Sequence, residues 1–162
     1  MNYYNNEKHL NYEQAKDKAL RLLEFRSHSE RELKDKLKRA GAEIEDIDKI
    51  LDFCRRYKFI DDESYAMRKA KDLKNLKHYG KRRIEQELYS KGISRENISI
   101  ALEELDFDEE EDILYPLVKK KLNNNFEKKS IDRTMRYFIY RGYEISDIKN
   151  CIERVKGEMD EF

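Results

Sequence analysis

The side chains best suited to catalysis in this 162-residue chain are its three histidines, His9, His28 and His78. None of them stands in an HExxH or HxH spacing, so the sequence shows no histidine metal motif. His28 lies between Ser27 and Ser29, and such neighbours could serve Ser/His nucleophilic chemistry. The chain offers no nucleophile elbow or strand scaffold for that chemistry. We therefore interpret His28 as a solvent-facing or helix-capping residue.

Clustered carboxylates are the second group that could hold a metal ion. Asp61 and Asp62 are adjacent, and residues 109–112 are all acidic. Successive residues fan around a helix and cannot converge on one ion, whereas acidic residues at a helix start are stabilised by the helix dipole. There is no GxxxxGK[ST] or GxGxxG loop. The sequence predicts no catalytic, metal or cofactor site and no enzyme, with a small hydrolase of unrecognised site as an alternative.

The two cysteines, Cys54 and Cys151, are too few and too distant for a zinc site or a disulfide framework. Each lies in a helical pattern, so we expect reduced and partly buried thiols. No apolar run approaches the roughly 18 residues of a membrane span. The first residues also lack the basic start and apolar core of a signal peptide. We therefore expect a cytoplasmic protein that contacts no membrane.

Basic side chains offer a better basis for function than the carboxylates. The chain is neutral overall, with 35 Lys and Arg against 35 Asp and Glu. Residues 68–83, however, hold eight Lys or Arg and one acid, whereas residues 106–112 hold six acids and no base. Such a basic patch can meet phosphates or an acidic protein face. In a chain with 43% charged residues, a solvated lysine-rich face is the alternative.

A second group of candidates lies in the last third of the chain. Arg133 and Arg136 share one helix side with Tyr137 and Tyr140, and Arg and Tyr are enriched in interface hot spots. The two tyrosines could instead pack against neighbouring helices. The predicted binding surface consists of Arg68, Lys71, Lys74, Lys81, Arg82, Arg83, Arg133 and Arg136.

Three glycines reveal an internal repeat of about fifty residues. Gly41, Gly92 and Gly142 are separated by 51 and 50 residues. Each glycine has an apolar residue four positions before it. Three more apolar residues stand one, six and ten positions after it. A helix that ends before a left-handed glycine and an apolar residue is typical of a Schellman turn. The apolar residues are Leu37, Leu88 and Phe138, then Ala42, Ile93 and Tyr143, then Ile47, Ile98 and Ile148, then Leu51, Leu102 and Ile152.

Each repeat also contains an earlier helix. Apolar residues at helical spacing predict helices over 13–26, 62–77 and 109–122. Ser29–Glu32 fits a capping box, and Asp61 or Asp62 can cap the next helix. Pro116 lacks a backbone donor and predicts a kink or a later helix start. We expect an all-α fold of three tandem three-helix repeats over 12–58, 61–105 and 108–157, with flexible ends over 1–11 and 158–162.

Residues 15–105 resemble the RecX family, whose motifs occur here in order. The first-repeat motif is ALRLLEFRSHSERELKDKLKRAG at residues 19–41. The junction motif is FIDDESYA at 59–66, and the second-repeat motif is YGKRRIEQELYSKGI at 79–93. The third unit matches in position and spacing, with weaker motif identity. The first motif is carried by Arg26, His28, Ser29, Glu32, Leu33, Lys36, Leu37 and Gly41.

The resemblance implies a protein of three-helix repeats in an elongated, curved arrangement, without enzymatic activity or cofactor. RecX proteins bind the RecA recombinase, lodge in the groove of its filament on DNA, and restrain ATP hydrolysis and strand exchange. The resemblance therefore implies a regulator of homologous recombination, DNA repair and the SOS response, with the RecA filament as partner. The neutral charge favours contact with protein and at most weak contact with DNA. We expect a monomer.

For mechanism, we hypothesise that the basic surface around residues 68–83 faces the filament and bridges adjacent RecA protomers. Reversal of Lys81, Arg82 and Arg83 to glutamate should then weaken binding without unfolding the chain. A helical DNA-binding module that acts without RecA is the main alternative, since three-helix units can place a helix in a major groove. It predicts salt-sensitive binding to bare DNA. A scaffold for another partner also stays open.

Overall fold

The computed structural model describes residues 9–107 and 110–160 of the chain. Within them the chain forms nine α-helices and no strand, with one isolated parallel β-bridge between Leu10 and Ala42. Three predictions lie partly outside these residues: most of the flexible segment 1–11, the first two residues of the third unit, and the last two of the segment 158–162. The predicted all-α fold is confirmed.

The helices of the described residues form three groups of three in chain order. Every extensive helix–helix contact among them lies within a group, and the first and third helix of each group pack side by side. The bounds are α1 Tyr12–Phe25, α2 Glu30–Arg39, α3 Ile44–Arg56, α4 Asp62–Asn75, α5 Lys81–Ser90, α6 Arg95–Glu103, α7 Glu110–Leu122, α8 Lys128–Tyr140 and α9 Ile145–Asp160.

Polar side chains start the helices where the sequence predicts them. The hydroxyl of Ser29 accepts a hydrogen bond from the Glu32 amide, and the Glu32 carboxylate accepts one from the Ser29 amide. This is the predicted capping box of α2. At α4 the cap is Asp61, whose carboxylate accepts from the Ser64 amide at 3.0 Å. Asp62 is therefore available for a different contact.

The three repeat glycines end α2, α5 and α8, as predicted. Gly41, Gly92 and Gly142 have φ values of +90°, +78° and +93°, a region that penalises any residue with a Cβ atom. The amide after each glycine donates to the carbonyl five residues earlier, at 3.1, 3.3 and 3.1 Å respectively. This bonding is the Schellman pattern. Each turn reverses the chain so that the third helix can pack back on the first.

Each group of helices encloses its own hydrophobic core. The twelve apolar repeat positions are all buried, and Leu37, Leu88 and Phe138 are at most 2% exposed. Cys54 and Cys151 are free thiols buried in the first and third cores, as predicted. Burial raises the pKa of the Cys54 thiol, and it raises that of Cys151 to about 11. These thiols are therefore packing residues of low reactivity.

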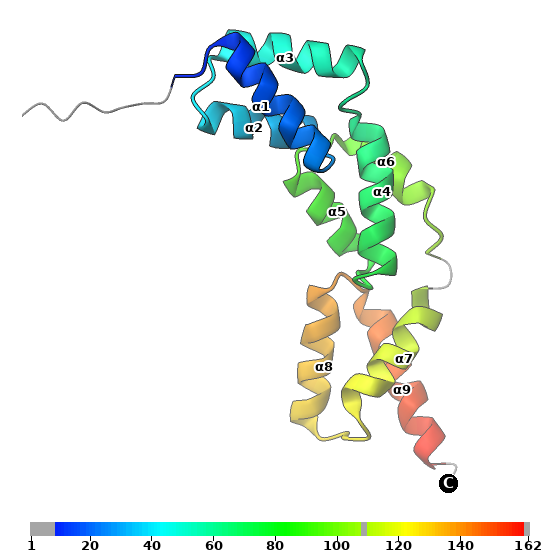
Figure 1. The fold of residues 1–162 in the computed structure, drawn as a ribbon. Helices are drawn as coiled ribbons and strands as arrows, with labels where there is room; N and C mark the ends of the chain where they lie inside the picture. Colours follow the sequence, from blue (N-terminus) through cyan, green and yellow to red (C-terminus); the bar gives the residue numbers. More distant parts are fainter. Residues whose placement is uncertain (1–8, 108–109, 161–162) are drawn as a thin grey trace, which may run out of the picture.

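Figure 1 shows the three units following one another along an elongated, bent molecule, with α1–α3 at one end and α7–α9 at the other. The second helices α2, α5 and α8 lie along the same side, the inner side of the bend. The predicted elongated and curved arrangement is confirmed. Because no core is shared, the ends of helices must hold the units together.

Pro116 does not delay the start of its helix. α7 begins at Glu110, six residues before the proline. Of the two predicted effects, a kink or a later helix start, the later start is therefore wrong. The proline occupies an exposed position on α7, where its ring needs no room in the core. At the other end of the third unit, α9 continues to Asp160, three residues past the predicted end of the unit at 157.

Candidate interaction surface and the joins between units

The eight basic residues of the predicted surface are exposed or partly exposed, and they are distributed over three helices. Three belong to α4, three open α5, and two lie on α8. Their contacts divide them into residues that are free to meet a partner and residues that are occupied inside the chain.

Arg68 and Lys71 belong to the free residues. Both are exposed on α4. Arg68 lines a hollow of about 300 Å³ with Arg26 and Asp72, where the first and second units meet. Among the described residues, neither Arg68 nor Lys71 forms an ion pair or a side-chain hydrogen bond. Their charges are therefore available to an acidic partner.

Lys74 and Lys81 converge on one aromatic ring. The Nζ atoms of Lys74 and Lys81 lie 4.8 and 5.8 Å from the centre of the Phe107 ring. Such cation–π contacts are weakly stabilising at exposed sites. Phe107 itself packs against the second core. The two lysines thus help to hold the segment after α6 against α4 and α5.

Arg82 and Arg83 are occupied by contacts with the third unit. The Nε atom of Arg82 lies 2.7 Å from a carboxylate oxygen of Glu144. The guanidinium of Arg83 pairs with Glu87 at 2.7 Å and lies 4.6 Å from the ring centre of Tyr140. Charge reversal at these two arginines would therefore disturb the contact between units and would not report cleanly on a partner.

Among the described residues, the arginines of α8 form no ion pair or hydrogen bond with another helix, whereas its tyrosines are partly covered by cations of other helices. Arg133 and Arg136 are exposed. Within the described residues, the only side-chain hydrogen bond that either arginine forms joins Arg136 to the carbonyl of Asp132. Tyr137 and Tyr140 are 39% and 69% exposed. Each ring lies against a cation of another helix. The tyrosines thus pack on neighbouring helices, as the second alternative predicts, and their exposed parts leave a role in an interface as a prediction.

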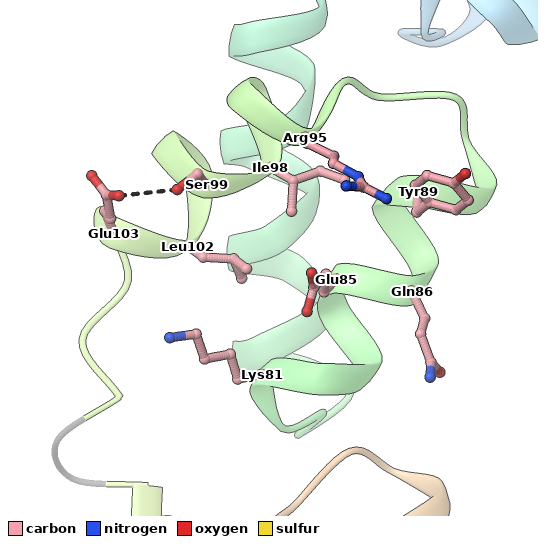
Figure 2. Close-up of a pocket in the computed structure, with 9 residues that line it drawn as sticks. All are labelled: Lys81, Glu85, Gln86, Tyr89, Arg95, Ile98, Ser99, Leu102 and Glu103. Atoms are coloured by element: carbon pink, nitrogen blue, oxygen red, sulfur yellow. Dashed lines mark hydrogen bonds between the residues drawn. The ribbon is translucent and has the colours of Figure 1, made fainter.

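A groove of about 630 Å³ between α5 and α6 was not predicted. Ile98 and Leu102 of α6 form its buried apolar wall, and the rim residue Tyr89 is 62% exposed. Figure 2 shows Lys81 at one end of the groove and Arg95 near Tyr89. The sequence signal for this groove is Tyr89, an aromatic residue in the second-repeat motif that has no place in the core.

The first and second units are joined by polar contacts at the start of α2. The hydroxyl of Ser29 donates to the carbonyl of Lys91 at 2.6 Å, directly before Gly92. The amide of Glu30 donates to the carboxylate of Asp62 at 2.8 Å. Helix starts leave amides without partners inside the helix. Here Asp62, a residue of the next unit, supplies the acceptor for one of these amides. Burial raises the pKa of the Asp62 carboxyl.

Glu32 is the electrostatic centre of this first join. Its carboxylate accepts from the Lys91 ammonium at 2.8 Å and from the Tyr65 hydroxyl at 3.3 Å, and it lies 3.5 Å from Arg26. Burial alone would raise its pKa, but the hydrogen bonds from Lys91 and from the Ser29 amide hold it at about 2. Burial, followed by the charge of Glu32, raises the pKa of Tyr65 to about 12. Glu32 is thus ionised and Tyr65 protonated at neutral pH.

The second and third units meet in the same manner at the start of α5. The amide of Gly80 donates to the carbonyl of Arg141 at 2.8 Å, directly before Gly142. The amide of Lys81 donates to the carboxylate of Glu110 at 3.2 Å. The two chains approach so closely that a Cβ atom on Gly80 would lie 2.5 Å from the carbonyl oxygen of Gly142. Burial raises the pKa of the Glu110 carboxyl.

These two joins are equivalent in the repeat. Ser29 and Gly80 are 51 residues apart, as are Gly41 and Gly92. In both joins the residue before the second helix contacts the glycine turn of the next unit. The first amide of that helix also bonds the carboxylate that opens the next unit's first helix. The sequence does not reveal this, because the contacts join distant residues and use backbone groups.

His28 corrects one prediction, because it is buried and does not face solvent. It is 3% exposed, and its Nδ1 atom lies 2.9 Å from the carbonyl oxygen of Arg26. This hydrogen bond within the short connection between α1 and α2 turns the ring inward. Burial lowers the pKa of His28, so the ring is neutral at neutral pH and Nδ1 donates to the carbonyl.

Among the described residues, no three His, Cys, Asp or Glu side chains are grouped to hold a metal ion. Over residues 9–107 and 110–160, no helix has the length and apolar character needed to cross a membrane.

Comparisons with known proteins agree with one another. Two family models match, the first three-helix domain of RecX over residues 15–54 and the second over 61–102. Regulatory protein RecX of Clostridioides difficile is 33% identical over 156 residues, which is 93% of this chain and 72% of that protein. Regulatory protein RecX of Salmonella paratyphi B is 34% identical over 151 residues, which is 85% of this chain and 89% of that protein.

Solved structures show the same fold. The crystal structure of RecX from Lactobacillus salivarius has a TM-score of 0.76 at 19% identity and covers 90% of this chain and 96% of its own. A crystal structure of regulatory protein RecX has a TM-score of 0.78 at 23% identity and covers 88% of this chain and 73% of its own.

Proposed function

The chain belongs to the RecX family of regulatory proteins, and from this premise we propose that it binds the RecA recombinase filament and restrains its ATPase and strand-exchange activities. The observation that carries the proposal is the end-to-end array of three units, which sets α2, α5 and α8 along the inner side of one bend (Figure 1). Repeat arrays of this kind offer long surfaces to extended partners. A protein filament is such a partner.

The joins explain how a chain of small units can act on a filament. Each unit has its own core, and its neighbours hold it through hydrogen bonds and ion pairs at helix ends. Contacts from successive units to successive protomers would favour one spacing of the filament. Turnover that needs protomers to move relative to one another would then be slowed, since a ligand shifts an equilibrium by its differential affinity for the two states.

Within the predicted surface, four residues are the best candidates for contact with the filament. Arg68 and Lys71 on α4 and Arg133 and Arg136 on α8 are exposed and make no ion pair within the described residues. Of the other four predicted residues, Lys74 and Lys81 contact the Phe107 ring. Arg82 and Arg83 contact the third unit across the second join. Free arginine side chains are suited to bidentate contact with carboxylates of a partner.

Binding of the chain to preformed RecA filaments, followed by fluorescence anisotropy, tests this assignment. We expect the paired reversals R68E/K71E and R133E/R136E each to weaken binding by about tenfold or more, because each replaces attraction by repulsion. The matched control is K18E/R21E on α1, which has the same charge change, the same spacing and two exposed positions. Unchanged binding in both test variants, with helicity intact, would show that these residues do not form the contact.

Binding to bare DNA separates this function from that of a DNA-binding module acting alone. The exposed arginines of α8 beside two tyrosines are the feature that favours such a module. Tight and strongly salt-dependent binding to bare DNA, without an effect on RecA, would support the module. We expect the reverse result, with binding that requires the RecA filament.

A further inference from the structure

A small hollow at the join of the second and third units is lined by cations. It measures about 370 Å³, at the low end of the roughly 300–1,000 Å³ of small-molecule sites. His78 reaches it from the connection after α4, Lys120 and Lys121 come from α7, and Tyr137 and Arg141 come from the end of α8. Neither the predicted surface nor the contacts of the join account for this convergence.

The charges of the hollow are not neutralised within the chain. Among the described residues no carboxylate lines it, and Lys120, Lys121 and Arg141 form no ion pair there. The neighbouring Lys119, by contrast, is paired with Glu158 at 2.7 Å. Three permanent cations around one hollow raise the local positive potential, which an anion can relieve.

Two of the three cations, Lys121 and Arg141, are also held in place. The Lys121 ammonium lies 4.2 Å and the Arg141 guanidinium 5.1 Å from the centre of the Tyr137 ring. Arg141 donates as well to the carbonyl of Lys77. His78 has a φ of +51°, and its carbonyl accepts from the Tyr143 hydroxyl at 2.9 Å. Donors that are already oriented lose less freedom when they bind an anion.

We propose that this hollow binds a short polyphosphate chain, such as that of a nucleoside triphosphate or of inorganic tripolyphosphate. Phosphate oxygens accept the charge-assisted hydrogen bonds that lysine and arginine donate. The ligand bridges His78 of the second unit to Lys120, Lys121 and Arg141 of the third. Occupancy therefore braces the second join and fixes the angle between the two units.

Calorimetric titration of the full chain with tripolyphosphate and with ATP tests the site, and it requires no RecA. The test variant is K120Q/K121Q. The matched control is K128Q/K129Q, an adjacent pair of exposed lysines on α8 without an ion pair in the described residues. We expect both ligands to bind the parent chain and the control, and the test variant to bind at least about tenfold more weakly, since two charge-assisted contacts are lost.

The two ligands distinguish the source of the phosphate. Equal affinity assigns recognition to the phosphate chain alone, and tighter binding of ATP adds a contact to the nucleoside. Bracing is read from amide hydrogen exchange at Gly80, whose amide bonds Arg141 across the join, and we expect exchange to slow when tripolyphosphate is bound. Absence of binding to the parent chain, equal loss in both variants, or binding of an oligonucleotide but of neither small ligand would overturn the proposal.

Discussion

The two joins between units share a backbone geometry and differ in the side chains around it. At the first join, the ionised carboxylate of Glu32 lies between Lys91 and a tyrosine hydroxyl, and its pKa is about 2. At the second, Gly80 replaces the serine, and Arg83 and Arg141 contact tyrosine rings. The repeat thus fixes how one unit meets the next and leaves the side chains to determine what holds each join together.

This difference implies that the joins fail for different reasons. The first depends on charge, so it should respond to removal of the carboxylate and to acid. The second depends on close approach of two glycines, so it should respond most to added volume and much less to the loss of a single charge. Because the joins set the bend of the array, each perturbation should also alter how the units are presented to a partner.

The largest effect is expected from added volume at the second join. Gly80 has an ordinary φ of −74°, so alanine there carries no backbone strain, yet its Cβ would meet the Gly142 carbonyl. We expect G80A to lower the free energy of unfolding by about 2–3 kcal/mol, as overpacking does. Urea denaturation followed by circular dichroism measures it.

Two variants calibrate that result. At the equivalent position of the first join, S29A removes a helix cap and the bond to Lys91, and should cost only about 1–2 kcal/mol. Gly157 of α9 has open space where a Cβ would be, so G157A should stabilise the chain by about 0.5–1 kcal/mol. A cost for G80A no larger than that for S29A would contradict the close-approach account.

Removal of charge should affect the first join next most strongly. In E32Q the Lys91 ammonium loses its carboxylate partner while the side chain keeps its size. We expect a loss of about 1.5–2 kcal/mol, the lower part of the range for hydrogen bonds to charged groups, because the join is partly open to solvent. The control is E153Q at an exposed position of α9, which should have little effect. Equal effects of the two substitutions would show that Glu32 is not the centre of the join.

Acid should loosen the first join in a defined pH window. The pKa of Glu32 is about 2 in the folded chain against an ordinary value of 4.5. A lowered pKa stabilises the fold above the unfolded value, and that stability is lost as pH falls from about 4.5 towards 2. Carboxyl-carbon NMR shifts should therefore place the Glu32 midpoint near 2 and, in a K91M variant, distinctly higher. A midpoint near 4.5 in the parent chain would refute the assignment.

The smallest effect is expected from the surface ion pair of the second join. Arg82 and Glu144 are 2.7 Å apart, but their side chains are 65% and 47% exposed. Exposed pairs contribute little, because water and salt screen them. We expect R82Q to change the free energy of unfolding by less than about 0.5 kcal/mol, and by less still in high salt. A larger loss would mean that charge matters to the second join as well.

The parts of the fold that the sequence predicts are those with local or periodic causes. Gly41, Gly92 and Gly142 mark left-handed turns because other residues are penalised there. The apolar positions around them follow the helical period and are all buried. Ser29 and Asp61 cap the helices they precede, since capping acts over three residues. Three units and nine helices in the described residues follow from these signals.

The candidate site could be predicted only in part, because its contacts are not local. Nothing near Arg82 or Arg83 indicates that Glu144 and Tyr140 will occupy them. The groove beside α6 depends on how two helices pack, and the sequence marks it only by one exposed tyrosine. The prediction for His28 is wrong for a different reason: a local backbone carbonyl, which residue types do not mark, turns the ring inward. Residue types suggested a basic surface, and tertiary contacts decide which of its members are free.

The most direct test of the central claim is the DNA-dependent ATPase rate of the cognate RecA filament on single-stranded DNA, titrated with this chain. The proposed function predicts a fall in rate at amounts well below those that would coat the DNA. It also predicts a weaker fall with R133E/R136E or R68E/K71E than with the K18E/R21E control. An unchanged rate at amounts that saturate the filament would contradict the claim that the chain restrains RecA.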